Sequence, residues 1–239
     1  VPGYFRQYTP NDDGAGHQLG LAAGGVLKHM DGALVSAAFY PPESHIKGIL
    51  VNKLGKRYVA EDCYHSRSSI FTTQQPDRKG WLILDEATYV PGVPSYGAYP
   101  LVDAFETLEE IEVALALPKG SLVETMRRYN EAAEKGEDPD FHKGKKWLKP
   151  LTHPPYAVLD ASVGAAAYMC FTLGGLDVSI DGEMLDAKGR AIPGLYAIGG
   201  CASNIAQEGT GYSSGTCIGE STFFGRRAGR HAARVAAGR

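Results

Sequence analysis

The chain lacks the features that mark metal-binding, disulfide-rich and membrane-spanning proteins. It has four cysteines and no Cys-x-x-Cys pair, so a zinc site is not expected and free thiols in a reducing, cytoplasmic compartment are favoured. Its seven histidines form no cluster in the sequence, which argues against a metal centre. No apolar run approaches the roughly 20 residues that a transmembrane helix needs. These absences predict a soluble, globular protein.

The chain also lacks an excess of basic charge. Its formal net charge is -3, so it has no positive field of the kind that attracts nucleic acid, and no nucleic-acid partner is expected. A length of 239 residues with 44% hydrophobic side chains is enough for one large domain or two small ones with a substantial core.

Turn signals and hydrophobic patterning predict the elements near both ends of the chain. The Gly-rich start predicts a loop and then a helix before residue 30. The stretch KGILVNKLGKRYVAED, residues 47–62, predicts a β-hairpin with a Leu-Gly turn. Later, LYAIGG at residues 195–200 predicts a buried strand that breaks into glycine, and a final helix is expected over residues 216–236.

Two capping signals predict helices in the middle of the chain. Thr107 precedes Glu110 by three residues, and Ser121 precedes Glu124 by three, which is the spacing of a capping box. The charged stretch that follows, residues 134–150, contains glycine and proline. It predicts an exposed connection with no bound partner, whose lysines are solvated.

The last expected helix is preceded by a bare, polar loop, EGTGYSSG, which contains one large side chain, Tyr212. A helix N-terminus offers unpaired backbone N–H groups and a partial positive charge, so glycines there let an electron-rich ligand approach the backbone. The same glycines would also suit turns and close helix packing. A Gly-rich motif alone does not decide between the two roles.

Several motifs, taken in order, resemble one flavoprotein family. The end of the chain reads GGLDVSIDGEMLDAKGRAIPGLYAIGGCASN and then EGTGYSSGTCIGESTFFGRRAGRHAA. This resembles the C-terminal flavin-binding part of the fumarate reductase and 3-ketosteroid dehydrogenase flavoproteins. The stretches LVNKLGKRYVAED and SLVETMRRYNEAAEKGEDPDF are similar to the substrate-capping domain of that family, and NDDGAGHQLGLAAGG is similar to its Gly-Asp-Gly turn and Ala-Gly helix.

The resemblance implies a fold class and a cofactor. It implies an α+β substrate-capping domain over residues 32–160 and the C-terminal part of an α/β, Rossmann-like FAD-binding domain over 161–239, with 1–31 returning from the FAD-binding domain. The family carries a Gly-x-Gly-x-x-Gly fingerprint that receives the pyrophosphate of FAD, and no such motif occurs here. We therefore expect the chain to match the C-terminal half of a family member, with the adenine-binding half missing from it, and to bind FAD poorly by itself.

Departures from the reductase motifs narrow the expected substrate. In the family, dicarboxylate reductases carry a His in His-Tyr-Thr-Met-Gly-Gly and a His and an Arg in His-Gly-Ala-Asn-Arg-Leu-Gly. The matching stretches here are CFTLGG and EGTGYSS, which place Cys170 and Glu208 at the His positions and Tyr212 at the Arg position. A dianionic substrate needs cationic donors, so dicarboxylate chemistry is not expected.

Tyrosines at two motifs match the ketosteroid dehydrogenases instead. In those enzymes a tyrosine of the capping domain and a second one in the C-terminal Gly-rich loop face the flavin across the steroid A-ring. Here these positions are Tyr64 and Tyr212, and Ser214 resembles the serine of the 4-dehydrogenase branch, which acts on 5α-reduced 3-ketosteroids. The resemblance implies that Tyr212 takes an α proton, that Ser214 relays it, and that a β hydride goes to flavin N5. Either tyrosine could instead be a core residue with its hydroxyl paired to backbone.

The remaining candidate residues are assigned through the same resemblance. His65, next to Tyr64, is the one histidine of interest. The expected substrate contacts are Gly209 and Phe171. The expected FAD contacts are Gly199, Gly200, Cys201, Ala202, Gly215, Thr216, Cys217 and Ile218.

Two other readings stay open. One is a flavin-dependent reductase of another unsaturated acid or ketone. The other is a non-catalytic fragment, either an incomplete product or a half that binds a partner polypeptide. In the leading reading the partner is a steroid-like ketone, and the electron acceptor is unknown.

Overall fold

The computed structural model describes residues 4–6, 11–37, 42–91, 99–203 and 205–238. It divides into two compact units, one made of Val1–Phe5 and Val35–Met169 and the other of Arg6–Leu34 and Cys170–Arg239. The chain passes between the units three times, each time within a strand of one sheet. That sheet has the order β1-β8-β3, formed by Tyr4–Arg6, Tyr168–Thr172 and Ala33–Ala37.

The first unit is built on a four-stranded antiparallel sheet with the order β4-β5-β7-β6. Its strands are Ile49–Asn52 (β4), Gly80–Asp85 (β5), Tyr156–Asp160 (β7) and Leu101–Phe105 (β6). Its helices are Glu43–Lys47 (η1), His65–Thr73 (α2), Pro76–Arg78 (η2), Leu108–Ala114 (α3), Ser121–Glu134 (α4) and Lys145–Trp147 (η4).

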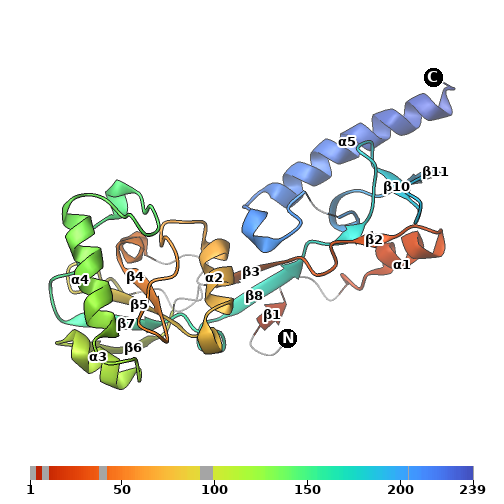
Figure 1. Ribbon diagram of the computed structural model, residues 1–239. Helices are drawn as coiled ribbons and strands as arrows, with labels where there is room; N and C mark the ends of the chain where they lie inside the picture. Colours follow the sequence, from red (N-terminus) through yellow and green to blue (C-terminus); the bar gives the residue numbers. More distant parts are fainter. Residues whose placement is uncertain (1–3, 7–10, 38–41, 92–98, 204, 239) are drawn as a thin grey trace. The chain divides into compact units, whose positions relative to one another are not determined.

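Both faces of this sheet are covered, and β5, one of its two inner strands, is buried at every position. Side chains alternate across a strand, and one face of the sheet, with Ile83, packs against Ile111 of α3 and Met126 of α4. The opposite face, with Leu82, packs against Phe71 of α2. Figure 1 shows α3 and α4 on one side of the sheet and α2 on the other.

The predicted hairpin at residues 47–62 is wrong in its second half. Strand β4 forms and ends in a turn, but its ladder partner is β5, with Ile49 opposite Ile83. The returning segment makes only an isolated bridge from Arg57 to Val51. It does not continue as a strand because the side chains of Arg57 and Glu61 enter a buried ion network.

The two predicted central helices are confirmed, and one of their two capping boxes is wrong. At α3 the box is present: the Thr107 side chain accepts the Glu110 N–H, and Glu110 accepts the Thr107 N–H. At α4 the N-cap is Gly120, in the left-handed region with φ 76°, and no side chain of the Ser121 box caps it. Instead Glu112, at the end of α3, accepts the first N–H groups of α4.

The connection after α4 was expected to be exposed, and this is wrong for two of its charged residues. Lys145 and Lys146 are exposed, but the side chain of Lys143 is fully buried and Asp138 is 7% exposed. They are buried because each pairs with an opposite charge from residues 57–61.

The second unit contains two short antiparallel sheets, β2-β9 and β10-β11, and two longer helices. Its strands are Leu27–Lys28 (β2), Gly175–Leu176 (β9), Glu183–Leu185 (β10) and Ala191–Tyr196 (β11). Its helices are Ala15–Ala22 (α1), Gly199–Cys201 (η5), Gly209–Gly211 (η6) and Thr216–Ala236 (α5). The early helix and the bounds of the last one are as predicted. In the part of the chain that the structure describes, no helix has both the length and the apolar character needed to cross a bilayer.

The strand predicted to be buried before residues 199–200 is half exposed. None of the six residues of β11 is buried, and in the described part of the chain the ladder partner of this strand is β10. A ladder to one neighbour leaves the other edge and much of both faces uncovered.

Candidate functional site

The Gly-rich loop and the start of α5 form one continuous turn in the second unit. A 3-10 turn, Gly209–Gly211, leads to Tyr212, and Gly215 then caps the helix with φ 93°. Such a positive φ is strained for residues with a Cβ, so glycine is the residue suited to that position. The backbone N–H and the hydroxyl of Thr216 both donate to the Ser213 carbonyl, which fixes the entry into the helix.

Tyr212 is buried within this turn, at 7% exposure. Its ring meets that of Phe171, from β8, edge to face, with centroids 5.3 Å apart. Its hydroxyl donates to Cys217 Sγ at 3.5 Å. The structure thus brings together three residues that the sequence assigned separately to catalysis, substrate binding and cofactor binding. The predicted substrate contact Gly209 is buried, and the predicted relay Ser214 is exposed at the loop surface.

The other predicted cofactor residues lie against the first turns of α5. Gly199 has φ 58°, and a Cβ there would stand 2.7 Å from the Ser221 hydroxyl, so the loop can approach the helix only with glycine. Ala202 forms a bridge with Leu176. Residues 199–202 and 216–218, predicted from two motifs, therefore belong to one region of the second unit.

A pocket of about 210 Å³ opens in this region. Its lining is mainly apolar with a few polar groups: Val178, Ser179, Ile180, Gly182, Ala197, Ile198, Gly199, Ala202, Ser203, Ile205, Glu220 and Phe224. Glu220 is buried, and its carboxylate accepts the Ile205 N–H. Burial raises the pKa of Glu220, and the Ile205 hydrogen bond opposes this only in part.

Two residues of this pocket, Glu220 and Ser203, are not predicted by the sequence motifs. Glu220 lies on the same helical face as Phe224 and Ala228. An acid at this spacing on an otherwise apolar face was the sequence signal that could have indicated a buried carboxylate. Ser203 is hydrogen-bonded to His29 Nδ1 at 2.9 Å, and no local pattern links residues so far apart in the chain.

The residues around the start of α5 fit one end of a flavin nucleotide. Where a Cβ would stand on Gly200, Gly211, Gly215 or Gly219 there is no atom within 4 Å, so backbone is accessible at each of them. The N-cap residue of this 21-residue helix is Gly215, which has no side chain to cap it. A helix N-terminus beside open glycines suits an electron-rich ligand group such as a ring carbonyl or a phosphate.

Tyr64 belongs to the first unit, where it precedes α2 as its N-cap residue. Its carbonyl accepts the Arg67 N–H at 2.7 Å, and its half-buried ring lies against that of His65, with centroids 4.2 Å apart. Burial lowers the pKa of His65, which favours a neutral imidazole beside the phenol.

The positions that match the dicarboxylate-binding residues of reductases contain no cation. Glu208 is exposed and its carboxylate accepts the Thr210 hydroxyl. Cys170 is a half-buried free thiol on β8. In the part of the chain that is described, no three His, Cys, Asp or Glu side chains are grouped closely enough to hold a metal ion.

Comparisons with known proteins relate this chain to flavin-dependent oxidoreductases. The 3-ketosteroid-Δ4-(5α)-dehydrogenase of Rhodococcus jostii RHA1, solved with 4-androstene-3,17-dione, is 40% identical with a TM-score of 0.82, over 92% of this chain and 45% of that one. The cytochrome-type fumarate reductase of Shewanella frigidimarina is 27% identical over 98% of this chain and 42% of its own length. Vinyl phenol reductase of Lactiplantibacillus plantarum is 34% identical over 56% of this chain and 27% of its own length.

The chain spans less than half of the length of each of these relatives. A family model described as FAD binding domain matches residues 8–215, which is most of the 239-residue chain. The structure has the mixed α and β content of this family, and FAD is the cofactor that the family binds. The chain belongs to the FAD binding domain family.

Proposed function

We propose that the protein acts in the FAD-dependent desaturation of a 3-ketosteroid of the 5α-reduced type, with Tyr212 as the proton acceptor. The observation that supports this best is the buried Tyr212 at the entry to α5, packed against Phe171, at a position where the dicarboxylate reductases have arginine. The 40% identity with a steroid dehydrogenase over 92% of this chain agrees with it.

The proposed reaction removes a proton from the carbon next to the ketone and a hydride from the neighbouring carbon, so that a C=C bond forms. FAD, when bound, supplies the hydride acceptor. Tyr212 takes the proton on its phenolate oxygen, and its apolar neighbour Phe171 limits access of water to the ring. The nearby N-terminus of α5 favours the negative charge on that oxygen, and Ser214 relays the proton to solvent.

The ketone oxygen gains negative charge as the α proton leaves, so it needs hydrogen-bond donors. In this proposal Tyr64, from the capping domain at residues 32–160, and the backbone at Gly209 donate to it. The residues proposed to contact FAD are the turn 199–202 and the start of α5 with its N-cap, 215–218. This assignment is supported by the helix N-terminus, whose N-cap is a glycine, and by the open glycines described above.

A flavin-dependent reductase of another unsaturated acid or ketone is the second candidate. The 34% identity with vinyl phenol reductase over 56% of the chain favours it. Among the substrates of such reductases, a dicarboxylate fits this chain least. Glu208 would add a third negative charge at a position where the reductases have cations.

Substrate preference tests the proposal. The flavin-loaded enzyme is assayed by dye reduction with a 5α-3-ketosteroid, and in the reverse direction with a reduced dye and fumarate, a vinyl phenol or a 4-ene-3-ketosteroid. We expect dye reduction with the saturated steroid and no turnover of fumarate. Activity on fumarate or a vinyl phenol, with none on either steroid, would move the chain to the second candidate.

A further inference from the structure

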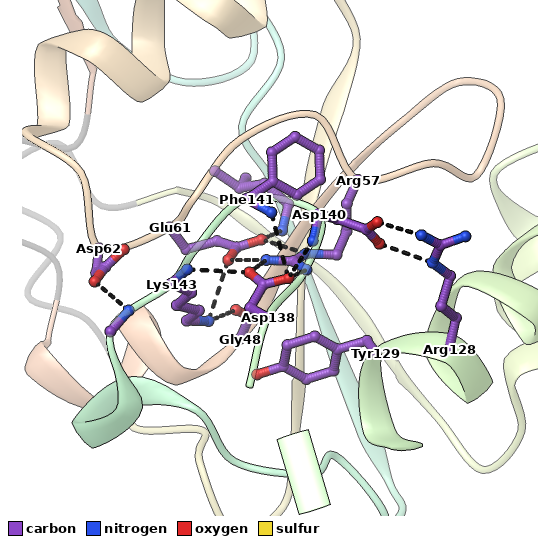
Figure 2. A network of polar contacts seen from close by, with 12 residues as sticks. Gly48, Arg57, Glu61, Asp62, Arg128, Tyr129, Asp138, Asp140, Phe141 and Lys143 are labelled. Atoms are coloured by element: carbon purple, nitrogen blue, oxygen red, sulfur yellow. Dashed lines mark hydrogen bonds and ion pairs between the residues drawn. The ribbon is translucent and has the colours of Figure 1, made fainter. Parts of the chain in front are cut away.

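Four charged side chains are buried together in the first unit (Figure 2). Arg57, Glu61, Asp138 and Lys143 have side chains between 0% and 5% exposed. Arg57 makes paired bonds to each carboxylate, at 2.9 and 3.1 Å to Glu61 and at 3.0 Å twice to Asp138. Lys143 Nζ lies 3.2 Å from Glu61. Two positive and two negative groups balance, so none is left as an uncompensated buried charge.

Aromatic rings enclose the guanidinium of Arg57. The ring centroids of Tyr129 and Phe141 lie 4.9 and 5.0 Å from it, which adds cation–π attraction and excludes water. Figure 2 shows the tyrosine of α4 and the phenylalanine of the following connection beside this group. The network therefore has one defined geometry.

The network fixes the segment 57–62 from two sides. On one side Glu61 accepts the Leu50 N–H of β4 at 2.9 Å. On the other side the connection after α4 is attached twice, through Lys143 to Glu61 and through the Gly144 N–H, which donates to Asp62 at 2.8 Å. The backbone just before Tyr64 thus takes its position from long-range contacts.

One residue separates this fixed segment from Tyr64. The Cys63 N–H donates to the Ala60 carbonyl at 3.1 Å, which makes a tight turn. The Tyr64 carbonyl then accepts the N–H of Arg67, in the first turn of α2. The tyrosine is therefore set between a turn held by the network and a helix held by the sheet.

Net stability alone does not account for such an arrangement. Replacing a buried ion network by well-packed apolar residues is often neutral or stabilising. What the charged groups add is a fixed geometry for a segment that forms neither strand nor helix, and one residue separates the end of this segment from a proposed substrate contact, Tyr64.

We propose that Glu61 and Asp62 are positioning residues for Tyr64, and that the ion network around Arg57 exists to hold that tyrosine at the substrate. This inference rests on the proposed function, in which Tyr64 contacts the ketone. The two claims have separate readouts, one spectroscopic and one kinetic.

The spectroscopic test uses protein with ¹³C-labelled tyrosine rings, in which Tyr64→Phe identifies the Tyr64 resonance. In the wild type this resonance is expected to be sharp and shifted by the neighbouring His65 ring. Glu61→Gln leaves the positive charges in excess, and we expect it to broaden the Tyr64 resonance or move it toward the position of an exposed tyrosine. Glu124→Gln is the matched control, since it removes an exposed ion pair with Arg127 on α4. It should leave the resonance unchanged.

The kinetic test measures kcat and KM of the flavin-loaded enzyme on a 5α-3-ketosteroid. A displaced contact at the reacting group lowers turnover by about 10²-fold, so Glu61→Gln should lower kcat by that order with a smaller change in KM. The double variant Glu61→Gln/Lys143→Met restores charge balance and should recover stability without recovering kcat. If Glu61→Gln does not fold, the same measurements are made on Asp62→Asn, which is a milder change.

The outcomes separate the two claims. A displaced Tyr64 resonance together with a reduced kcat supports the positioning role. If the variant folds and is less stable, but its Tyr64 resonance is unmoved and its kcat is that of the wild type, the positioning role is overturned. The network then only stabilises the fold. A wild type without steroid turnover refutes the proposed function, while the resonance still decides whether the network positions Tyr64.

Discussion

At the scale of single residues, the proposed role of Tyr212 as proton acceptor depends on the groups around its hydroxyl. Phenol is a weak acid with an ordinary pKa near 10, so it makes a proton acceptor only where its anion is stabilised. Here its hydroxyl meets the Cys217 thiol at the first turn of a 21-residue helix, and its ring lies against Phe171. A thiol can donate to the phenolate, and the helix N-terminus adds partial positive charge.

We therefore predict that Tyr212→Phe lowers turnover of a 5α-3-ketosteroid by about 10²- to 10⁴-fold while FAD stays bound, since this is the usual contribution of a general base. Steady-state dye reduction and flavin absorbance measure the two effects. Tyr168→Phe is a matched control, because that fully buried hydroxyl donates to the Ala161 carbonyl. The control should lose stability and keep its turnover. Near-normal turnover of Tyr212→Phe would show that Tyr212 is a packing residue and not the proton acceptor.

For Glu208 we predict the opposite of Tyr212, namely that its substitution has little effect on turnover. Its carboxylate is exposed and bonded to Thr210, so it is not held at a reacting atom. Glu208→Gln should change steroid turnover by no more than a few-fold, within the range of surface substitutions. A thousandfold loss in the same dye assay would show that Glu208 is a catalytic acid and would reopen the reductase reading.

At the scale of elements, the start of α4 shows a cap that comes from a preceding helix. The Glu112 carboxylate accepts the N–H groups of Gly120, Leu122 and Val123 at 2.6, 2.7 and 3.2 Å. Burial acts to raise the pKa of Glu112, but these hydrogen bonds outweigh it and the pKa lies below its ordinary value. The Glu112 side chain therefore joins α3 to α4 more strongly when it is charged than when it is protonated.

This cap predicts a pH-dependent stability. A depressed pKa contributes stability above the unfolded pKa, near 4.3, and the contribution is lost as the pH falls through the lower folded pKa. Glu112→Gln should lower the free energy of unfolding by about 1 kcal/mol at pH 7. The difference in this free energy between the variant and the wild type should become smaller as the pH falls below about 4. Urea unfolding at several pH values measures this, with the exposed Glu109→Gln as control. A gap that stays constant down to pH 3 would contradict the role of the charge.

Local patterns predicted elements well wherever local residues supply the partners. The capping box at Thr107 and the bounds of α5 follow from residues within one turn. The Ser121 pattern misled because Glu112, nine residues before Ser121, caps the first turn of α4 instead. The second hairpin strand failed for a similar reason, since Arg57 pairs with Asp138, 81 residues away. A local pattern carries no information about such distant charges.

At the scale of the whole molecule, the same limit applies to the site. The sequence supplied Phe171, Tyr212 and Cys217 through motifs, and the structure shows that they touch. It did not supply Glu220, because an acid on an apolar helical face is a weak local signal and its burial depends on the loop that folds over it, here through the Ile205 N–H. Tyr64 lies in the other unit, and its part in a shared site stays a prediction of the motifs.

The division into units leads to a last prediction, about FAD. The residues that fit the cofactor are the N-terminus of α5 and the loops beside it, whereas no Gly-x-Gly-x-x-Gly motif for the pyrophosphate occurs in the 239 residues. We expect these residues, expressed by themselves, to lose FAD on dialysis, as read from flavin absorbance.

The fold should not depend on the cofactor, because the four-stranded sheet of the first unit has its own core on both faces. Circular dichroism and urea unfolding, recorded with and without added FAD, should therefore give the same main transition. Stoichiometric yellow protein after dialysis would show that the helix N-terminus and its loops suffice to hold the whole nucleotide. A main transition that appears only with FAD would instead show that the first unit needs the cofactor to fold.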